Sequence, residues 1–169
     1  MDAIDTQQAD RQAQRMQDNR QELVERLMRA VPQDGIVQPL EGIYLARSSV
    51  SMEPLHSVVK PSFCVIAQGS KGVFLGDNLY RYDSSHYLIS TVELPRLSQI
   101  LEASQELPYL SFRLVLDPAL VGSVMVETGH ASPPAHVDVR AMDVSPLDVN
   151  LQDAVVRLVR LPKRRCSCR

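Results

Sequence analysis

Short apolar segments separated by turn-forming residues dominate positions 61–116 of the chain. The separators are Gly69, Gly72, Gly76, the pair Asp77-Asn78 and the pair Ser84-Ser85. Apolar runs of strand length bounded by such residues are typical of successive antiparallel β-hairpins. Because a twisted antiparallel sheet of this kind closes on itself, the pattern predicts a mainly β domain built as a barrel around an internal cavity.

Two of the expected strands carry the most information about the core. The expected strands lie around Ile36-Val37 and over Ile43 to Val50, Phe63 to Gln68, Val73 to Leu75, Leu79 to Tyr82, Tyr87 to Thr91, Leu97 to Glu102 and Tyr109 to Leu116. In the last of these, Leu110, Phe112 and Leu114 alternate with Tyr109, Ser111 and Arg113, the period expected of a strand with one face in the core. Positions 63–67 are apolar throughout, which predicts a strand covered by a helix on one face and by the barrel interior on the other.

Helices are expected on both sides of this β region. Residues 1–18 are polar and lack apolar periodicity, so we expect a disordered N-terminal tail. A first helix is predicted to begin at Asn19 and to end at Pro32, with an apolar stripe that includes Leu23 and Leu27. A second helix is predicted from Asp117 to Gly129, where a linker begins that runs to His136.

The third predicted helix has the strongest boundary pattern. Ser145 is expected to cap it, Pro146 to occupy its first turn and Asp148 to complete the capping box. An apolar stripe follows at Leu147, Leu151, Ala154, Val155 and Leu158. Such a stripe suits packing against the barrel as well as it suits a partner helix across a dimer interface, and both roles stay open.

Composition and charge narrow the class of protein. A chain of 169 residues with 44% apolar and 22% charged residues suits one globular domain with appendages. The sequence contains no apolar stretch long enough to span a membrane and no secretory signal, so we expect a cytoplasmic protein. Its three cysteines, Cys64, Cys166 and Cys168, do not form a disulfide framework. Positive charge gathers in the tail 162–169, and the rest of the chain is too acidic to attract a phosphate backbone.

The sequence shows no pattern of known catalytic chemistry. Histidines occur at His56, His86, His130 and His136 without the close spacing that a metal cage on neighbouring strands requires, so neither a catalytic metal nor another cofactor is expected. A nucleophile elbow, a phosphate-binding loop and a dinucleotide fingerprint are all missing. Cys64 lies in an apolar strand and is expected to be an inert buried thiol.

Polar residues near the ends of the predicted strands suggest a binding pocket instead. Tyr80 and Tyr82 share one strand face, and Gln68 and Lys71 lie at the preceding strand end and turn. Tyrosines supply both a flat wall and a hydroxyl, as small-molecule pockets require. Any one of these residues also suits packing on an outer helix or a solvated turn. As a group, however, they favour a pocket.

Three long blocks of the sequence resemble one protein family. They are KPSFCVIAQGSKGVFLGDNLYRYDSSHYLISTVELP, ASQELPYLSFRLVLDPALV and SPLDVNLQDAVVRLVRL. Through them, residues from about Asp18 to Leu161 resemble the N-terminal domain of AraC/XylS-type bacterial transcription regulators. The resemblance implies a cupin-like barrel, or double-stranded β-helix, that senses a small molecule and dimerises through its helices without catalysis. The implied effector-binding residues are Gln68, Lys71, Tyr80, Tyr82 and Tyr87, and the implied dimer interface is Leu147, Leu151, Ala154, Val155 and Leu158.

The resemblance stops before the family's helix-turn-helix domain. We therefore expect a tail over 1–18, a sensing and dimerisation domain over 19–161 and a basic tail over 162–169, as in a truncated regulator. Such a chain would form homodimers, bind an unidentified effector and contact DNA only through the domain that it lacks. The alternative is a small metal-free cupin enzyme, an isomerase or epimerase acting on a sugar or small acid, with Tyr80 or His86 as acid or base.

Overall fold

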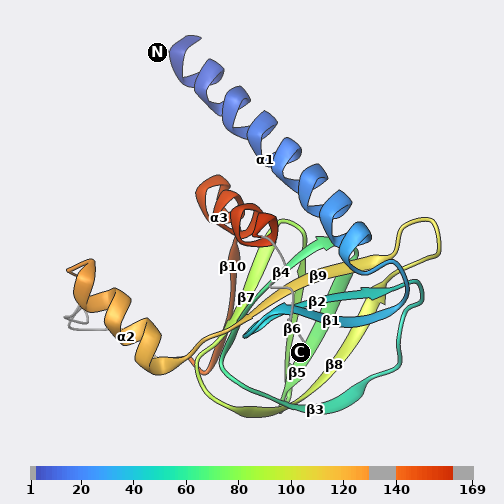
Figure 1. The fold of residues 1–169 in the computed structure, drawn as a ribbon. Helices are drawn as coiled ribbons and strands as arrows, with labels where there is room; N and C mark the ends of the chain where they lie inside the picture. The colour runs from blue at the N-terminus through green and yellow to red at the C-terminus, as the bar shows by residue number, and fades with distance from the viewer. Residues whose placement is uncertain (1–2, 130–139, 162–169) are drawn as a thin grey trace, which may run out of the picture.

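The computed structural model describes residues 3–129 and 140–161 (Figure 1). In chain order its elements are α1 (Ala3–Ala30), β1 (Gly35–Leu40), β2 (Ile43–Ser48), β3 (Leu55–Val59), β4 (Ser62–Gln68), β5 (Ser70–Leu75), β6 (Asn78–Asp83), β7 (His86–Ser90), β8 (Leu94–Glu102), β9 (Tyr109–Val115), α2 (Pro118–Glu127), β10 (Met142–Pro146) and α3 (Val149–Arg160). The expected linker and the basic tail over 162–169 fall largely outside the described residues.

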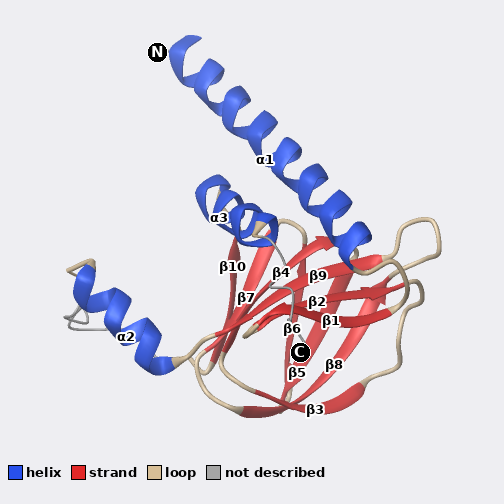
Figure 2. Ribbon diagram, in the orientation of Figure 1, coloured by secondary structure: helices blue, strands red, loops and turns tan. Residues whose placement is uncertain are grey.

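The strands form two antiparallel sheets (Figure 2). Sheet A has the order β1-β2-β9-β4-β7-β10 and sheet B the order β3-β8-β5-β6. The expected mainly β fold with flanking helices is confirmed. The expected closed barrel is wrong in one respect, because no ladder among the described residues joins the two sheets. The chain instead changes sheet between β4 and β5 and again between β6 and β7, so these neighbouring strands do not form the predicted hairpins.

β4 contributes to two separate hydrophobic cores, as its uniformly apolar sequence predicts. Val65 and Ala67 belong to the helix-side core between sheet A and the helices. Cys64 and Ile66 belong to the inter-sheet core between the two sheets. Because successive side chains of a strand point to opposite faces, one short segment supports both layers.

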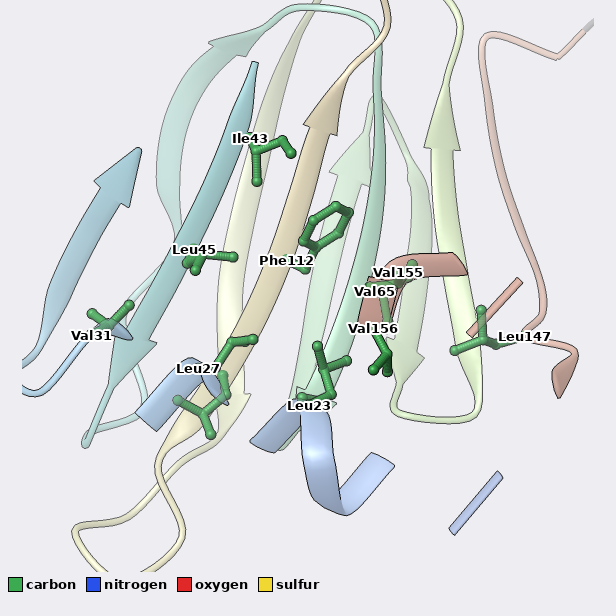
Figure 3. Packing of buried hydrophobic residues seen from close by; sticks show 12 residues of the cluster. Leu23, Leu27, Val31, Ile43, Leu45, Val65, Phe112, Leu147, Val155 and Val156 are labelled. Atoms are coloured by element: carbon green, nitrogen blue, oxygen red, sulfur yellow. The ribbon is translucent and has the colours of Figure 1, made fainter. Parts of the chain in front are cut away.

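Helices α1 and α3 cover the outer face of sheet A (Figure 3). Leu23 and Leu27 of α1 and Val156 of α3 are almost completely buried in the helix-side core. Each leucine that is fully buried in this way contributes about 1.5–3 kcal/mol. The guanidinium of Arg160 links the helices, since its Nε donates to Glu22 Oε1 at 2.7 Å and its Nη2 donates to Oε2. The burial of Leu23 and Leu27 confirms that the apolar stripe predicted for the first helix packs in the core.

The first helix begins much earlier than predicted. The structure starts it at Ala3 rather than Asn19, so the segment expected to be a disordered tail forms the exposed half of α1. Its alanine, glutamine and arginine residues have high helix propensity. A hydrogen bond one turn apart, from Gln14 Nε2 to Asp18 Oδ1 at 2.8 Å, adds local support. Helix propensity, without an apolar stripe, accounts for this half.

The predicted start of the third helix is wrong by one turn. Ser145 and Pro146 form the end of β10, which pairs with β7 up to His86. The helix is capped by Asp148, whose Oδ1 accepts from the backbone N–H groups of Asn150 at 2.8 Å and Leu151 at 3.0 Å. Proline is tolerated at this place because β10 is an edge strand of sheet A.

α2 begins where the sequence predicts and lies apart from both sheets (Figure 1). Asp117 caps it, accepting from the N–H groups of Ala119 at 2.8 Å and Leu120 at 3.2 Å. None of its residues is buried, although most of them are apolar. Within residues 3–129 and 140–161, no helix combines the length and the apolar character needed to cross a membrane.

Candidate functional site

A cavity of about 100 Å³ lies between the two sheets. Its lining side chains come from both layers: Ile36, Tyr44, Ala46, Cys64, Tyr109, Ser111, Phe112 and Arg113 from sheet A, and Lys71, Tyr82 and Arg96 from sheet B. The lining combines three cationic groups, three phenol rings and a few apolar side chains. This is the mixture of an apolar body and a few convergent polar groups that small-molecule sites show.

The sheet A wall of the cavity follows from strand alternation. In β9, Leu110 and Phe112 belong to the helix-side core, so Tyr109 and Arg113 point between the sheets. The pairing register sets Arg113 opposite Tyr44 of β2. The Arg113 guanidinium carbon lies 4.4 Å from the centre of the Tyr44 ring, a cation–π contact that fixes the charge at the cavity wall.

The sheet B wall carries the other two cations. Lys71 of β5 pairs directly with Tyr82 of β6, so the amine and the phenol share one face. Arg96 of β8 is only 6% exposed, yet its Nε and Nη1 atoms have no hydrogen-bond partner. Buried guanidinium groups are normally paired because leaving one unpaired is costly. The orphaned Arg96 is therefore the most unusual feature of the cavity.

The electrostatics of the cavity are uniformly positive. Burial, together with the positive charges of Arg96 and Arg113, lowers the pKa of Lys71 to about 8. Burial raises the pKa of Tyr82 and of Tyr109, so both phenols stay neutral at physiological pH. No carboxylate among the described residues lines the cavity.

Only part of the predicted effector set meets in this cavity. Lys71 and Tyr82 line it, and Tyr80 packs against the same inter-sheet core without lining the space. Gln68 is used elsewhere, since its Nε2 donates to the carbonyl oxygen of Pro108 at 2.8 Å. Tyr87 lies on the opposite face of sheet A, in the helix-side core.

The sequence analysis did not place most of the cavity residues in the predicted effector set, among them Tyr109, Arg113 and Arg96. Tyr109 and Arg113 occupy the strand face opposite the predicted core, a face that alternation alone assigns to solvent. Sheet B covers that face, and a sequence pattern does not reveal which second layer will do so. Arg96 has no distinguishing sequence pattern around it. The only available indication was an arginine inside an otherwise half-apolar strand.

The residues considered for other chemistry lie outside the cavity. His86 is in an exposed position where its Nδ1 lies 3.2 Å from Asp83 Oδ1, and it does not line the cavity. In the described ranges, no three histidine, cysteine, aspartate or glutamate side chains gather in a way that would hold a metal ion. Cys64 is buried and belongs to the cavity wall.

The predicted dimer stripe is largely occupied within the chain itself. Leu147 and Val155 are buried in the helix-side core, and Leu151 and Leu158 are half-buried against it. Ala154 is half-buried on α3. A contact with a second copy through this stripe stays a prediction.

A second hollow, of about 210 Å³, lies on the helix side of sheet A. Aliphatic side chains such as Leu40, Ile43 and Leu158 form most of its wall. Its charged neighbours are Arg26, which is bonded to Glu22, and the exposed Arg29. It therefore lacks the buried, unpaired polar groups that distinguish the inter-sheet cavity.

Comparison with family models identifies one family. Residues 39–167 match the family described as "AraC-type transcriptional regulator N-terminus". Among solved structures, an apo variant of ToxT from Vibrio cholerae strain SCE256 is similar at a TM-score of 0.45 and 8% identity, over 70% of this chain and 46% of that one. A 1.65 Å structure of ToxT from Vibrio cholerae gives 0.42 and 12%, over 73% and 50%. This chain thus spans about half the length of those proteins, and no curated protein matches its sequence.

Proposed function

The chain belongs to the AraC-type transcriptional regulators through their N-terminal domain, and we propose that residues 19–161 sense a small-molecule effector in the cavity between the two sheets. On this proposal the domain binds its effector without converting it and acts as a cytoplasmic homodimer. Contact with DNA is left to a helix-turn-helix domain outside residues 19–161.

The observation that carries the proposal is the cavity itself. It is lined by side chains of both sheets and holds polar groups that the chain's own interactions leave unused, most clearly the Nε and Nη1 atoms of Arg96. A domain that needed only to be stable would gain by filling this space with apolar side chains. Retained polar groups around an internal space favour recognition of a ligand.

The layering offers a route from the cavity to the helices. In β9, Arg113 faces the cavity while the adjacent Phe112 packs in the helix-side core beneath α1 and α3. In β4, Cys64 and Val65 divide in the same way. We propose that an effector which shifts these strands also shifts the two helices, and that the stripe of α3, Leu147, Leu151, Ala154, Val155 and Leu158, transmits the shift across a dimer.

A thermal-shift screen with a cavity-filling control tests the sensing function. The screen would use small acids, sugars, aromatic compounds and alcohols, and mass spectrometry would follow each active compound for conversion. We expect a compound that raises the Tm of the wild-type chain, stays chemically intact and loses its effect in Ser111→Leu, which fills the cavity. Ser123→Leu on the exposed α2 is the matched control and should keep the response.

Two results of this screen would contradict the proposal. Conversion of the active compound would favour the enzyme alternative. An equal Tm shift in Ser111→Leu and in the wild type would place the binding site outside the cavity.

A further inference from the structure

We propose that the ligand of the inter-sheet cavity is a small organic carboxylate, whose anionic group is held by Arg96 together with Lys71 and Arg113. This inference rests on the proposed sensing function and names the chemical class of the effector. It is carried by the charge balance, the hydrogen-bonding state and the size of the cavity, which are independent of the family match.

The charge balance favours an anion. Lys71, Arg96 and Arg113 all line the cavity, and no carboxylate among the described residues lines it with them. Glu102, the acidic residue of β8, is exposed and pairs with Arg81 at 3.6 Å. Asp83 at the end of β6 is likewise exposed and accepts from the backbone N–H of Ser85 at 2.9 Å. These carboxylates are used outside the cavity, so the cations inside it are uncompensated.

The hydrogen-bonding state of Arg96 leaves donors free for an anionic partner. Its Nε and Nη1 are two N–H donors of one planar guanidinium, both buried and both unpaired. Hydrogen bonds from a guanidinium to a carboxylate are charge-assisted and are among the strongest that proteins make. A neutral alcohol or sugar would leave the positive charge of the three side chains uncompensated.

The remaining wall and the volume point to a short organic acid rather than to an inorganic anion. Ala46 and the largely exposed Ile36 contribute apolar surface to the cavity wall, which a ligand with a hydrocarbon part would cover. An engineered cavity of about 150 Å³ is known to hold benzene. The present space of about 100 Å³ therefore suits an acid of a few carbons. Burial also keeps the hydroxyl groups of Tyr82 and Tyr109 protonated beside this space.

The amine of Lys71 gives the proposal a second signature. Because the pKa of Lys71 is about 8, a measurable part of the molecules carries a neutral amine near this pH. A carboxylate bound beside it favours the protonated form and raises its pKa. Binding of the anion at pH 8 should therefore be accompanied by proton uptake, which binding of a neutral ligand would not produce.

Thermal unfolding of the whole chain with matched compounds tests the inference. The probes are sodium butyrate, butyramide, butanol and sodium phosphate, each compared with sodium chloride at equal ionic strength. We expect butyrate to raise the Tm of the wild type by about 3–6 °C at a tenfold excess over Kd, with no comparable shift for the amide or the alcohol. Calorimetry at pH 8 in buffers of different ionisation enthalpy should show proton uptake on butyrate binding.

Two arginine variants separate the cavity from the surface. In Arg96→Met the butyrate shift should disappear, while the Tm without ligand should equal or exceed that of the wild type because an unpaired buried charge is removed. Arg81→Met, on the exposed face of the same sheet, should keep the full shift. Where Arg96→Met does not fold, Lys71→Met provides the same comparison and should also lose the proton uptake.

The outcomes distinguish this inference from the proposed function. Equal stabilisation by butyramide would overturn the carboxylate assignment and leave a small-molecule sensor standing. Stabilisation by phosphate equal to that by butyrate would also overturn it. If no probe stabilises the wild type beyond chloride, the inference fails, and the broader screen with Ser111→Leu decides the sensing function separately.

Discussion

Replacing Gly69 with alanine should disturb the point where the chain passes from sheet A to sheet B. Gly69 lies between β4 and β5 and has a φ of +86°, a backbone conformation that side chains other than glycine rarely adopt. A Cβ atom placed there would lie 2.4 Å from the carbonyl oxygen of Glu102 and 3.3 Å from Cα of Tyr109. The substitution therefore strains the backbone and also collides with the neighbouring backbone.

The expected loss of stability follows from these two contributions. The left-handed conformation costs an alanine about 1–2 kcal/mol, and an atom forced into a closely packed place costs about 1–3 kcal/mol more. Alanine restricts the unfolded chain more than glycine does, and this stabilises the folded state by about 0.4–1 kcal/mol. We expect a loss of about 2–4 kcal/mol in the free energy of unfolding for Gly69→Ala. Gly76→Ala is the matched control, because Gly76 has a φ of +59° and open space around it, and it should lose about 1 kcal/mol.

Urea unfolding followed by circular dichroism measures both variants, with the loss taken from the midpoint at constant slope. Equal losses for Gly69→Ala and Gly76→Ala would refute the close approach of Glu102. Because Tyr109 lines the cavity, Gly69→Ala should also weaken the response to any effector found by the thermal-shift screen.

Three further predictions concern the core and the ionisable groups. Leu27→Ala should lower the free energy of unfolding in urea by about 2–5 kcal/mol, whereas the partly exposed Met28→Ala should lose far less, and similar losses would place α1 off the core. The hydrogen bonds from Arg160 lower the pKa of Glu22 to about 2. The stabilisation by ionised Glu22 is therefore present above its ordinary pKa and is lost as the pH falls from about 4.5 to 2. Glu22→Gln should abolish this part of the acid dependence of stability, and an unchanged dependence would contradict the pairing of Glu22 with Arg160. The folded pKa of Lys71 lies below its ordinary value, so wild-type stability should rise relative to Lys71→Met between about pH 8 and 10.5, and parallel pH profiles would show that Lys71 is solvated.

The sequence predicted what depends on local alternation and helix capping. The strand faces of β4 and β9 and the start of α2 at Asp117 are confirmed. For α3 the sequence predicted Ser145 as the cap and Asp148 as the acidic residue that completes the capping box. In the structure Ser145 pairs with Tyr87 in the β10–β7 ladder, and Asp148 caps the helix instead. A local pattern does not contain that tertiary contact.

The candidate site was only half predictable for a related reason. Lys71 and Tyr82 are neighbours in one hairpin, so their common face follows from the turn between β5 and β6. Arg96 and Arg113 come from strands of different sheets, and their convergence depends on how the sheets face each other. The alternation of apolar and polar residues predicts on which face of a strand a residue lies. It does not predict whether that face is exposed to solvent or covered by a second sheet.

The solvent-exposed second helix has a consequence for the local dynamics of the domain. A helix of ten residues is marginally stable in water unless tertiary contacts hold it, and α2 buries no residue. It should therefore open and close repeatedly while the sheets stay intact. Backbone amides of α2 should exchange with deuterium orders of magnitude faster than those of α3, whose inner face lies in the helix-side core.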